Sequence, residues 1–328
     1  MQTNARLGIA AIIGTALLAL SGCAAAPSSD GGSREDGRIA VVAVTDAYGS
    51  IVGAIGGELV EVTSIISGSA QDPHEYEANA RDQLAVSRAE LVVVNGGGYD
   101  DFMLRLLESS TAVVVDASEA SGLMPGDAAA GHDHAEDDAD HDDEVVSHDG
   151  HTHIEGFNEH VWYSIHAVEH IAEVITAELL ALAPAGAEEI EANAAAFLAE
   201  LDALHDRAHA LEHDLGGGDI ISTEPVAAYL LEGLGLHDVT PGAFAAAIES
   251  GTGVSARILD DVLRSLEDRE IRLLAVNAQS AGPEAELVRD AAEAAGIPIV
   301  EFAETLPAGM DFLGWVAANL DAVEHALR

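Results

Sequence analysis

The stretch "AEEIEANAAAFLAELDALHDRAHALEHDL", residues 187–215, decides the architecture of this chain. Its apolar residues recur at helical spacing, namely Ile190, Phe197, Leu201, Leu204, Leu211 and Leu215. Pro184 precedes the stretch and Gly216 to Gly218 follow it, and these residue types begin and end helices. Such a helix would be about 40 Å long, enough to run the height of two domains. We therefore assign residues 184–215 to a stiff linker helix.

Short apolar runs alternate with helix-length segments on both sides of this linker. Residues 39–183 contain the runs "IAVVAV", "VEVTSII", "LVVVN" and "AVVVD", and residues 216–328 contain "DIIST", "HDVTP", "IRLLAV" and "IPIVEF". Nearly continuous apolar runs bounded by turn or helix signals are typical of buried parallel strands. The predicted fold class is α/β, with two α/β lobes joined by one long rigid helix.

Composition limits the classes of function. The chain has 328 residues, a 48% hydrophobic content and a formal net charge of −45. This length suits two lobes better than one core. Nucleic acid is excluded as a partner because the chain would repel its phosphates. We expect a monomer.

The N-terminus has the layout of a secretion signal. Arg6 precedes the apolar run "LGIAAIIGTALLAL", which ends in Leu20-Ser21-Gly22-Cys23 and resembles the lipobox of a bacterial lipoprotein. Cys23 is the only cysteine, so an intrachain disulfide is excluded. We interpret residues 1–22 as a signal peptide and residues 23–38 as a tether lipidated at Cys23. The mature protein is expected to be extracytoplasmic and anchored to the cell membrane.

Four metal-binding side chains follow predicted strands or open a predicted helix. His74 follows "VEVTSII", Glu224 follows "DIIST", Glu304 follows "IPIVEF", and His160 lies between the stretch 131–153 and the next helix. Ligands of open α/β lobes bind outside the carboxyl ends of the strands. We therefore expect these four residues, two from each lobe, to meet in one interlobe cleft.

A second candidate is the stretch "GHDHAEDDADHDDEVVSHDGHTH", residues 131–153. It combines many acidic residues with six histidines, which are His132, His134, His141, His148, His151 and His153. Histidine and carboxylate groups bind divalent metals readily. The composition offers too little apolar surface to fold by itself.

Five motifs, in this order, resemble those of the metal-binding lipoproteins that serve zinc and manganese ABC importers. They are "TSIISGSAQDPHEYE", "VVVNGGGYDDFM", "NEHVWYS", "IISTEPVAAYLLEGLGL" and "IPIVEFAETLPAGMDFLGWV". The resemblance implies one metal ion between two lobes, bound by His74, His160, Glu224 and Glu304. It also implies delivery of that ion to an ABC permease and its ATPase.

Two positions depart from the family pattern. Many zinc members have histidine where Glu224 stands, and glutamate there is more familiar in manganese members. Proline is common where Glu159 stands, a change that we expect to affect only the loop.

Zinc members carry a histidine-rich acidic loop just before the second ligand, so the stretch 131–153 is interpreted as an accessory collector. The alternative is a solvated loop with no role. Zn²⁺ is the expected cargo, because imidazoles bind Zn²⁺ better than Mn²⁺. Mn²⁺ is the alternative cargo.

Two other classes of function compete with this interpretation. "HAVEH", residues 166–170, matches the H-x-x-E-H of inverted zinc proteases, with Glu169 as the residue that would activate water. However, "HALEH" at residues 209–213 matches the same pattern, and no third ligand can be named. A passive metal store or adhesin would need only the histidine-rich stretch. We expect a binding protein and no enzyme.

Overall fold

A computed structural model describes residues 37–68, 73–74, 76–125, 145–148, 151–154, 156–268, 270–280 and 282–328. Among these residues, no helix is both long enough and apolar enough to cross a membrane. The predicted signal peptide, Cys23, and His132, His134 and His141 lie outside the described residues.

The N-terminal lobe is built on a four-stranded parallel sheet with the order β2-β1-β3-β4. Its strands are β1 (Ile39–Thr45), β2 (Val60–Ile66), β3 (Leu91–Val94) and β4 (Val113–Asp116). The connections are α1 (Asp46–Gly56), η1 (Gly57–Leu59), α2 (Ala80–Val86), α3 (Asp101–Leu107) and α4 (Ala117–Ala120). Strand β1 is buried at every position because it lies inside the sheet, between β2 and β3.

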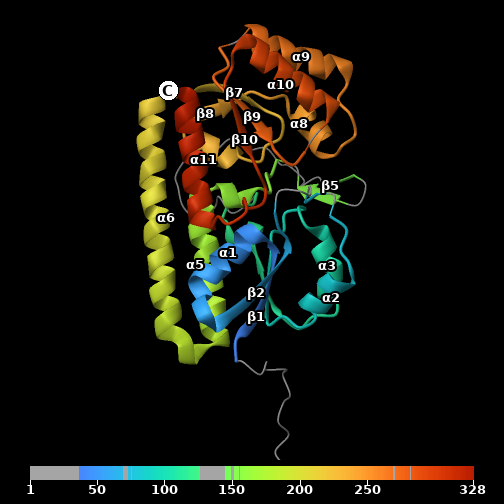
Figure 1. Cartoon of the computed structure of the whole chain (residues 1–328). Helices are drawn as coiled ribbons and strands as arrows, with labels where there is room; N and C mark the ends of the chain where they lie inside the picture. Colours follow the sequence, from blue (N-terminus) through green and yellow to red (C-terminus); the bar gives the residue numbers. More distant parts are fainter. Residues whose placement is uncertain are drawn as a thin grey trace, which may run out of the picture. The chain divides into compact units, whose positions relative to one another are not determined.

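The C-terminal lobe has a second four-stranded parallel sheet, with the order β10-β9-β7-β8. Its strands are β7 (Gly218–Ser222), β8 (Leu236–Asp238), β9 (Leu274–Asn277) and β10 (Ile299–Phe302). Its helices are α7 (Ala228–Glu232), α8 (Gly242–Glu249), α9 (Ala256–Asp268), α10 (Pro283–Ala295) and α11 (Phe312–Leu327). Figure 1 shows both lobes, which confirm the predicted fold class.

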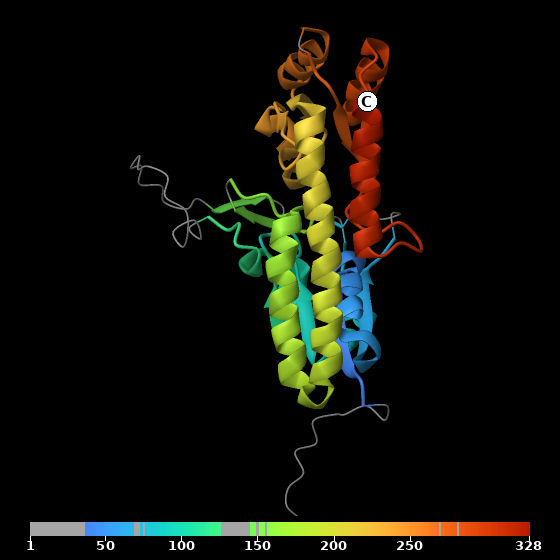
Figure 2. The ribbon, with the colours of Figure 1, turned by 90° about the vertical axis from the view of Figure 1, so that its left-hand side faces the viewer.

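Helix α6 (Ala187–Leu215) has the same bounds as the stretch that predicted it. It follows η3 (Val161–Tyr163), α5 (Ile165–Leu182) and η4 (Pro184–Gly186), and it ends at Gly216 in the left-handed conformation. Its buried stripe packs against α1 and α5 of one lobe and α11 of the other. Figure 2 shows α6 running beside both α5 and α11. At its C-terminal half, Arg207 forms ion pairs with Asp321 and Glu324 of α11.

The core continues from one lobe into the other. Tyr163 lies edge-on to Phe302 and to Trp315, and its hydroxyl donates to the carbonyl of Ala303 at 2.7 Å. These aromatic side chains belong to one buried cluster that also includes the core of the first sheet. A separate cluster around Phe244, β9 and α10 fills the far side of the C-terminal lobe.

The end of the histidine-rich stretch forms regular structure. Strands β5 (Val145–His148) and β6 (His151–Ile154) pair in antiparallel register, with His148 opposite His151. The backbone of residues 145–148 and 151–154 thus forms a hairpin within the whole chain, although the composition was expected to be unable to fold by itself. The hairpin leads directly into the segment that carries His160.

Candidate metal centre

Three of the four predicted ligands lie together. One ligand atom from each of His74, His160 and Glu304 lies within 4.8 Å of the other two. The Nε2 atoms of His74 and His160 are 3.6 and 3.8 Å from Oε2 of Glu304. The side chains of His160 and Glu304 are fully buried, and that of His74 is 8% exposed. His74 follows β2, His160 precedes η3 and Glu304 follows β10. Together these residues could hold one metal ion.

Asn158 sets the orientation and the tautomer of His160. Its Oδ1 accepts the backbone N–H of His160 at 3.2 Å and lies 2.7 Å from the ring Nδ1, while its Nδ2 donates to the carbonyl of Pro225 at 2.9 Å. If the Asn158 amide were flipped, its NH₂ group would face the backbone N–H of His160 and its oxygen would face the carbonyl of Pro225. Both contacts are unfavourable, so these partners fix the orientation of the amide. Nδ1 of His160 then carries a proton, because only a donor can face Oδ1. In the neutral ring this leaves the lone pair on Nε2, the atom that faces Glu304, and a metal ligand requires that state.

Glu304 is held by residues from both lobes. Tyr99 donates its hydroxyl to Oε2 at 2.9 Å, and Asn277 donates Nδ2 to Oε1 at 2.8 Å. The side chain of Gln279 accepts the backbone N–H groups of Glu304 and Thr305. Burial, together with the negative charge of Glu304, raises the pKa of Tyr99 well above its usual value. Tyr99 therefore stays protonated and acts as a donor to this carboxylate.

Tyr99 reaches the site because glycines shape the turn before it. Gly96 and Gly97 have φ values of +71° and +65°, which side chains rarely adopt. A Cβ at Gly96 would also collide with the carboxylate of Asp116, and one at Gly97 with the ring of Phe157. The turn is therefore restricted to glycine at both positions.

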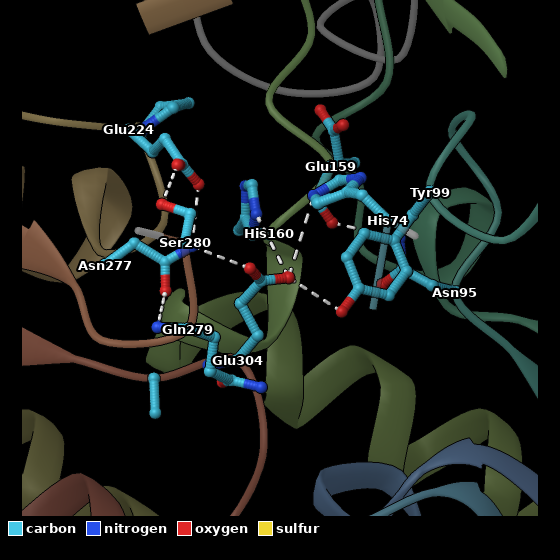
Figure 3. A network of polar contacts seen from close by, with 12 residues as sticks. His74, Asn95, Tyr99, Glu159, His160, Glu224, Asn277, Gln279, Ser280 and Glu304 are labelled. Atoms are coloured by element: carbon cyan, nitrogen blue, oxygen red, sulfur yellow. Dashed lines mark hydrogen bonds and ion pairs between the residues drawn. The ribbon is translucent and has the colours of Figure 1, made fainter. Parts of the chain in front are cut away.

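Glu224, the fourth predicted ligand, lies beside this group but is not part of it. Its carboxylate accepts Nδ2 of Asn277 at 2.6 Å and the hydroxyl of Ser280. Asn277 thus bridges Glu224 and Glu304, as Figure 3 shows. Burial raises the pKa of Glu224, the hydrogen bonds from Ser280 and Asn277 lower it, and the nearby charge of Glu304 raises it. An ion at the three clustered residues would favour the charged form of Glu224.

The "HAVEH" motif of the competing hydrolase interpretation, residues 166–170, lies outside the clustered ligands. His166 and His170 stack edge-on with ring centroids 4.7 Å apart, and the side chain of His166 is 67% exposed. A cavity of about 120 Å³ lies beside His166 and is also lined by His205 and His209. Within the described residues, neither group of three clustered metal-binding side chains includes His166 or His170.

Several residues at the site were not identified from the sequence. Asn158, Tyr99 and Asn277 are polar partners of the predicted ligands, and only Asn158 is near its partner in the sequence. Glu159 was expected to change only the loop, yet its carboxylate lies near His74, together with that of Glu249. A glutamate in place of the usual proline was the one available signal.

Comparisons with known proteins agree with this architecture. A family model described as the periplasmic zinc-uptake complex component A matches residues 41–326. The manganese-binding lipoprotein MntA of Halalkalibacterium halodurans is 30% identical over 194 residues, which are 58% of this chain and 55% of that protein. The zinc-binding lipoprotein AdcA of Streptococcus pneumoniae is 30% identical over 182 residues, or 53% of this chain and 33% of that protein.

The matched region thus spans about half the length of the first relative and a third of the second. Among solved structures, the periplasmic zinc-binding protein TroA from Treponema pallidum has the same fold. Its TM-score is 0.68 at 19% identity, covering 89% of this chain and 99% of that one.

Proposed function

Because this chain belongs to the family of the zinc-uptake complex component A, we propose that it is a solute-binding protein that captures one divalent metal ion for an ABC importer. The observation that carries the proposal is the buried group of His74, His160 and Glu304, whose ligand atoms lie within 4.8 Å of one another. The relatives named for zinc and for manganese support a first-row divalent ion as cargo.

The donor set favours zinc. Neighbouring ligands of a tetrahedral zinc ion with bonds of about 2.0 Å lie about 3.3 Å apart. The separations of 3.6 and 3.8 Å between the two imidazole nitrogens and Glu304 are near this value, so small shifts would close the shell. Zn²⁺ also stands well above Mn²⁺ in general affinity for nitrogen and oxygen ligands. Mn²⁺ is the alternative, because carboxylates that bind through both oxygens can raise the coordination number.

Glu224 is proposed as the fourth ligand. Its carboxylate is 3% exposed and is linked to Glu304 through Asn277. Two carboxylates would neutralise the charge of the ion, and a rotation of the Glu224 side chain away from Ser280 would bring an oxygen toward it. The histidine-rich residues 131–153 would serve as an accessory collector with weaker sites.

The remaining parts of the proposal concern the place of the protein in the cell. Lipidation of Cys23 would anchor a monomer on the extracytoplasmic side of the cell membrane. The partners would be an ABC permease and its ATPase, to which the ion is delivered. An enzymatic role is not proposed, because the family consists of solute-binding proteins.

The decisive experiment is elemental analysis of protein purified without added metal, followed by competition between Zn²⁺ and Mn²⁺. We expect one tightly bound Zn²⁺ per chain, lost in Glu304→Ala. Preference for Mn²⁺ over equimolar Zn²⁺ would overturn the zinc assignment alone. Tight binding that survives Glu304→Ala would overturn the site.

A further inference from the structure

A second group of metal-binding side chains shares His74 with the site described above. One ligand atom from each of His74, Glu159 and Glu249 lies within 4.8 Å of the other two. Glu159 is 4% exposed and directly precedes His160, and Glu249 is the partly buried last residue of α8. We refer to His74, Glu159 and Glu249 as the outer site, and to His74, His160 and Glu304 as the inner site.

The backbone that carries Glu159 is fixed by both lobes. Asn95, at the end of β3, donates Nδ2 to the carbonyl of Glu159 at 3.0 Å, and Tyr229 of α7 donates its hydroxyl to the carbonyl of Asn158 at 2.8 Å. The backbone N–H of Val161 also donates to the Glu159 carbonyl. In Figure 3 the carboxylate of Glu159 is turned away from that of Glu304. The backbone on which the Glu159 side chain stands is therefore held from both lobes, which favours a defined site over a loose one.

The charges of the outer site favour a cation. Two carboxylates lie within 4.8 Å of each other, and one of them is almost excluded from water. Glu249 also lies at the C-terminal end of an eight-residue helix, where the helix dipole is negative and disfavours a carboxylate. A divalent ion between Glu159, Glu249 and a nitrogen of His74 would be attracted by both carboxylates. Nitrogen and carboxylate oxygen are ligands that first-row divalent ions accept.

We propose that the outer site binds the incoming divalent ion first and passes it to the inner site. This inference rests on the proposed function, since it concerns how the inner site is filled. His74 belongs to both groups, so it would be a ligand of the ion in both positions, while Glu159 and Glu249 are exchanged for His160 and Glu304. The outer site offers three protein ligands, whereas the inner site would gain Glu224 as a fourth, so the outer ion is held more weakly.

The order of segments along the chain suits this route. Strand β6 ends at Ile154, and only residues 155–158 separate it from Glu159. Among the residues of the two sites, Glu159 is therefore the nearest along the chain to the histidine-rich stretch. The inner-site residues His160 and Glu304 are fully buried, whereas Glu249 is partly exposed. The outer site is thus the more accessible of the two.

The first test measures whether the outer site exists. Zn²⁺ is titrated by calorimetry into the full-length chain in detergent, using Glu304→Gln to weaken the inner site. Adding Glu159→Gln to this variant should remove one bound Zn²⁺ per chain. Adding Glu77→Gln is the matched control, because Glu77 is an exposed carboxylate close to His74 in sequence and outside both groups. Sites in the histidine-rich stretch are common to all three proteins and cancel in the comparison.

The second test measures whether the outer site lies on the path of loading. Trp162 reports on the inner site, since its ring centroid is 5.3 Å from that of His160. Stopped-flow fluorescence gives the rate of Zn²⁺ loading and the rate of release into excess chelator, for Glu159→Gln and Glu249→Gln in the otherwise unchanged chain. A shared path is used in both directions, so we expect both rates to fall by the same factor. Loss of charge alone would slow loading but speed release.

The outcomes separate the two proposals. Equal Zn²⁺ counts with and without Glu159→Gln would overturn the outer site. Release that becomes faster, or rates that match those of Glu77→Gln, would overturn its role in loading. A native chain without one tightly bound Zn²⁺ would refute the proposed function. The outer site would still be detected in that case, as a bound Zn²⁺ that is lost in Glu159→Gln.

Discussion

Replacing Asn158 should weaken metal binding although Asn158 would not touch the metal. In Asn158→Leu the ring N–H of His160 loses its acceptor at 2.7 Å, and the carbonyl of Pro225 loses its donor. His160 is fully buried, so no water replaces the lost acceptor. Leaving a buried donor unsatisfied costs about 1–3 kcal/mol. The ring can also adopt the other tautomer, in which Nε2 carries a proton and cannot bind the ion.

The metal-free ring can escape this cost by changing tautomer, whereas the metal-bound ring cannot, so the cost falls on binding and corresponds to about 5- to 150-fold in affinity. Partners of metal-binding histidines are typically worth about 10- to 100-fold. We therefore expect Zn²⁺ to bind Asn158→Leu about 10- to 100-fold more weakly, as measured by competition with a chromophoric chelator. Asn158→Asp is the matched control, because it also loses the bond to Pro225 but keeps an acceptor for the ring. It should bind Zn²⁺ at least as tightly as the native chain. A folded Asn158→Leu protein with native affinity would refute the role assigned to this hydrogen bond.

Four further predictions follow from the sequence and the site. Glu224→His should retain Zn²⁺ and reduce any Mn²⁺ binding, because a third imidazole replaces an oxygen ligand; thermal shifts with both ions measure it, and unchanged Mn²⁺ binding would contradict it. Deletion of residues 133–151 should leave one tight ion and fewer weak ones in a calorimetric titration, and loss of the tight ion would contradict the accessory role. Cys23→Ala should release the protein from membranes on cell fractionation without loss of metal binding, whereas retention at native levels would argue against the lipid anchor. Burial raises the pKa of Asp100 from 3.8 to about 7, so protonation of Asp100 stabilises the folded chain fully below about pH 3.8, and this stabilisation is lost as the pH rises through about 7. In Asp100→Asn the melting temperature should therefore depend less on pH between these two values. An unchanged pH profile of the melting temperature would exclude Asp100 as the source of that dependence.

The elements that could be predicted from the sequence are those with strong local patterns. The C-terminal end of α6 was predicted at residue 215, where three glycines follow a long apolar stripe. The linker expected from residue 184 begins with η4 and becomes α-helical only at Ala187. Helix α8 was missed because "GAFAAAIE" is short and rich in alanine, which gives no periodic contrast between apolar and polar residues. In the motif "IISTEPVAAYLLEGLGL", helix α7 begins only at Ala228, because the chain first makes a turn closed by the bond from the N–H of Ala228 to the carbonyl of Pro225.

Part of the candidate site was also predictable from local sequence patterns. Residues just after parallel strands meet at one sheet edge, so His74 and Glu304 could be selected from strand positions alone. Tyr99 and Glu304 are 205 positions apart, and no local pattern relates them. The bridging role of Asn277 depends on the distance between two carboxylates, which only the folded chain defines. Glu249 was missed together with α8, the helix that carries it.

The contacts between the lobes bear on how a bound ion is released. The backbone N–H of Leu306 donates to Asp46, and that of Phe312 donates to Ser50, so both ends of the segment after Glu304 are tied to α1. A wide hinge motion would break these bonds and expose the aromatic core shared by the lobes. His74 is the most exposed of the three clustered ligands, at 8% against full burial for the other two. We propose that release begins at His74, and because His74 serves both groups, its departure would open the inner and the outer site together.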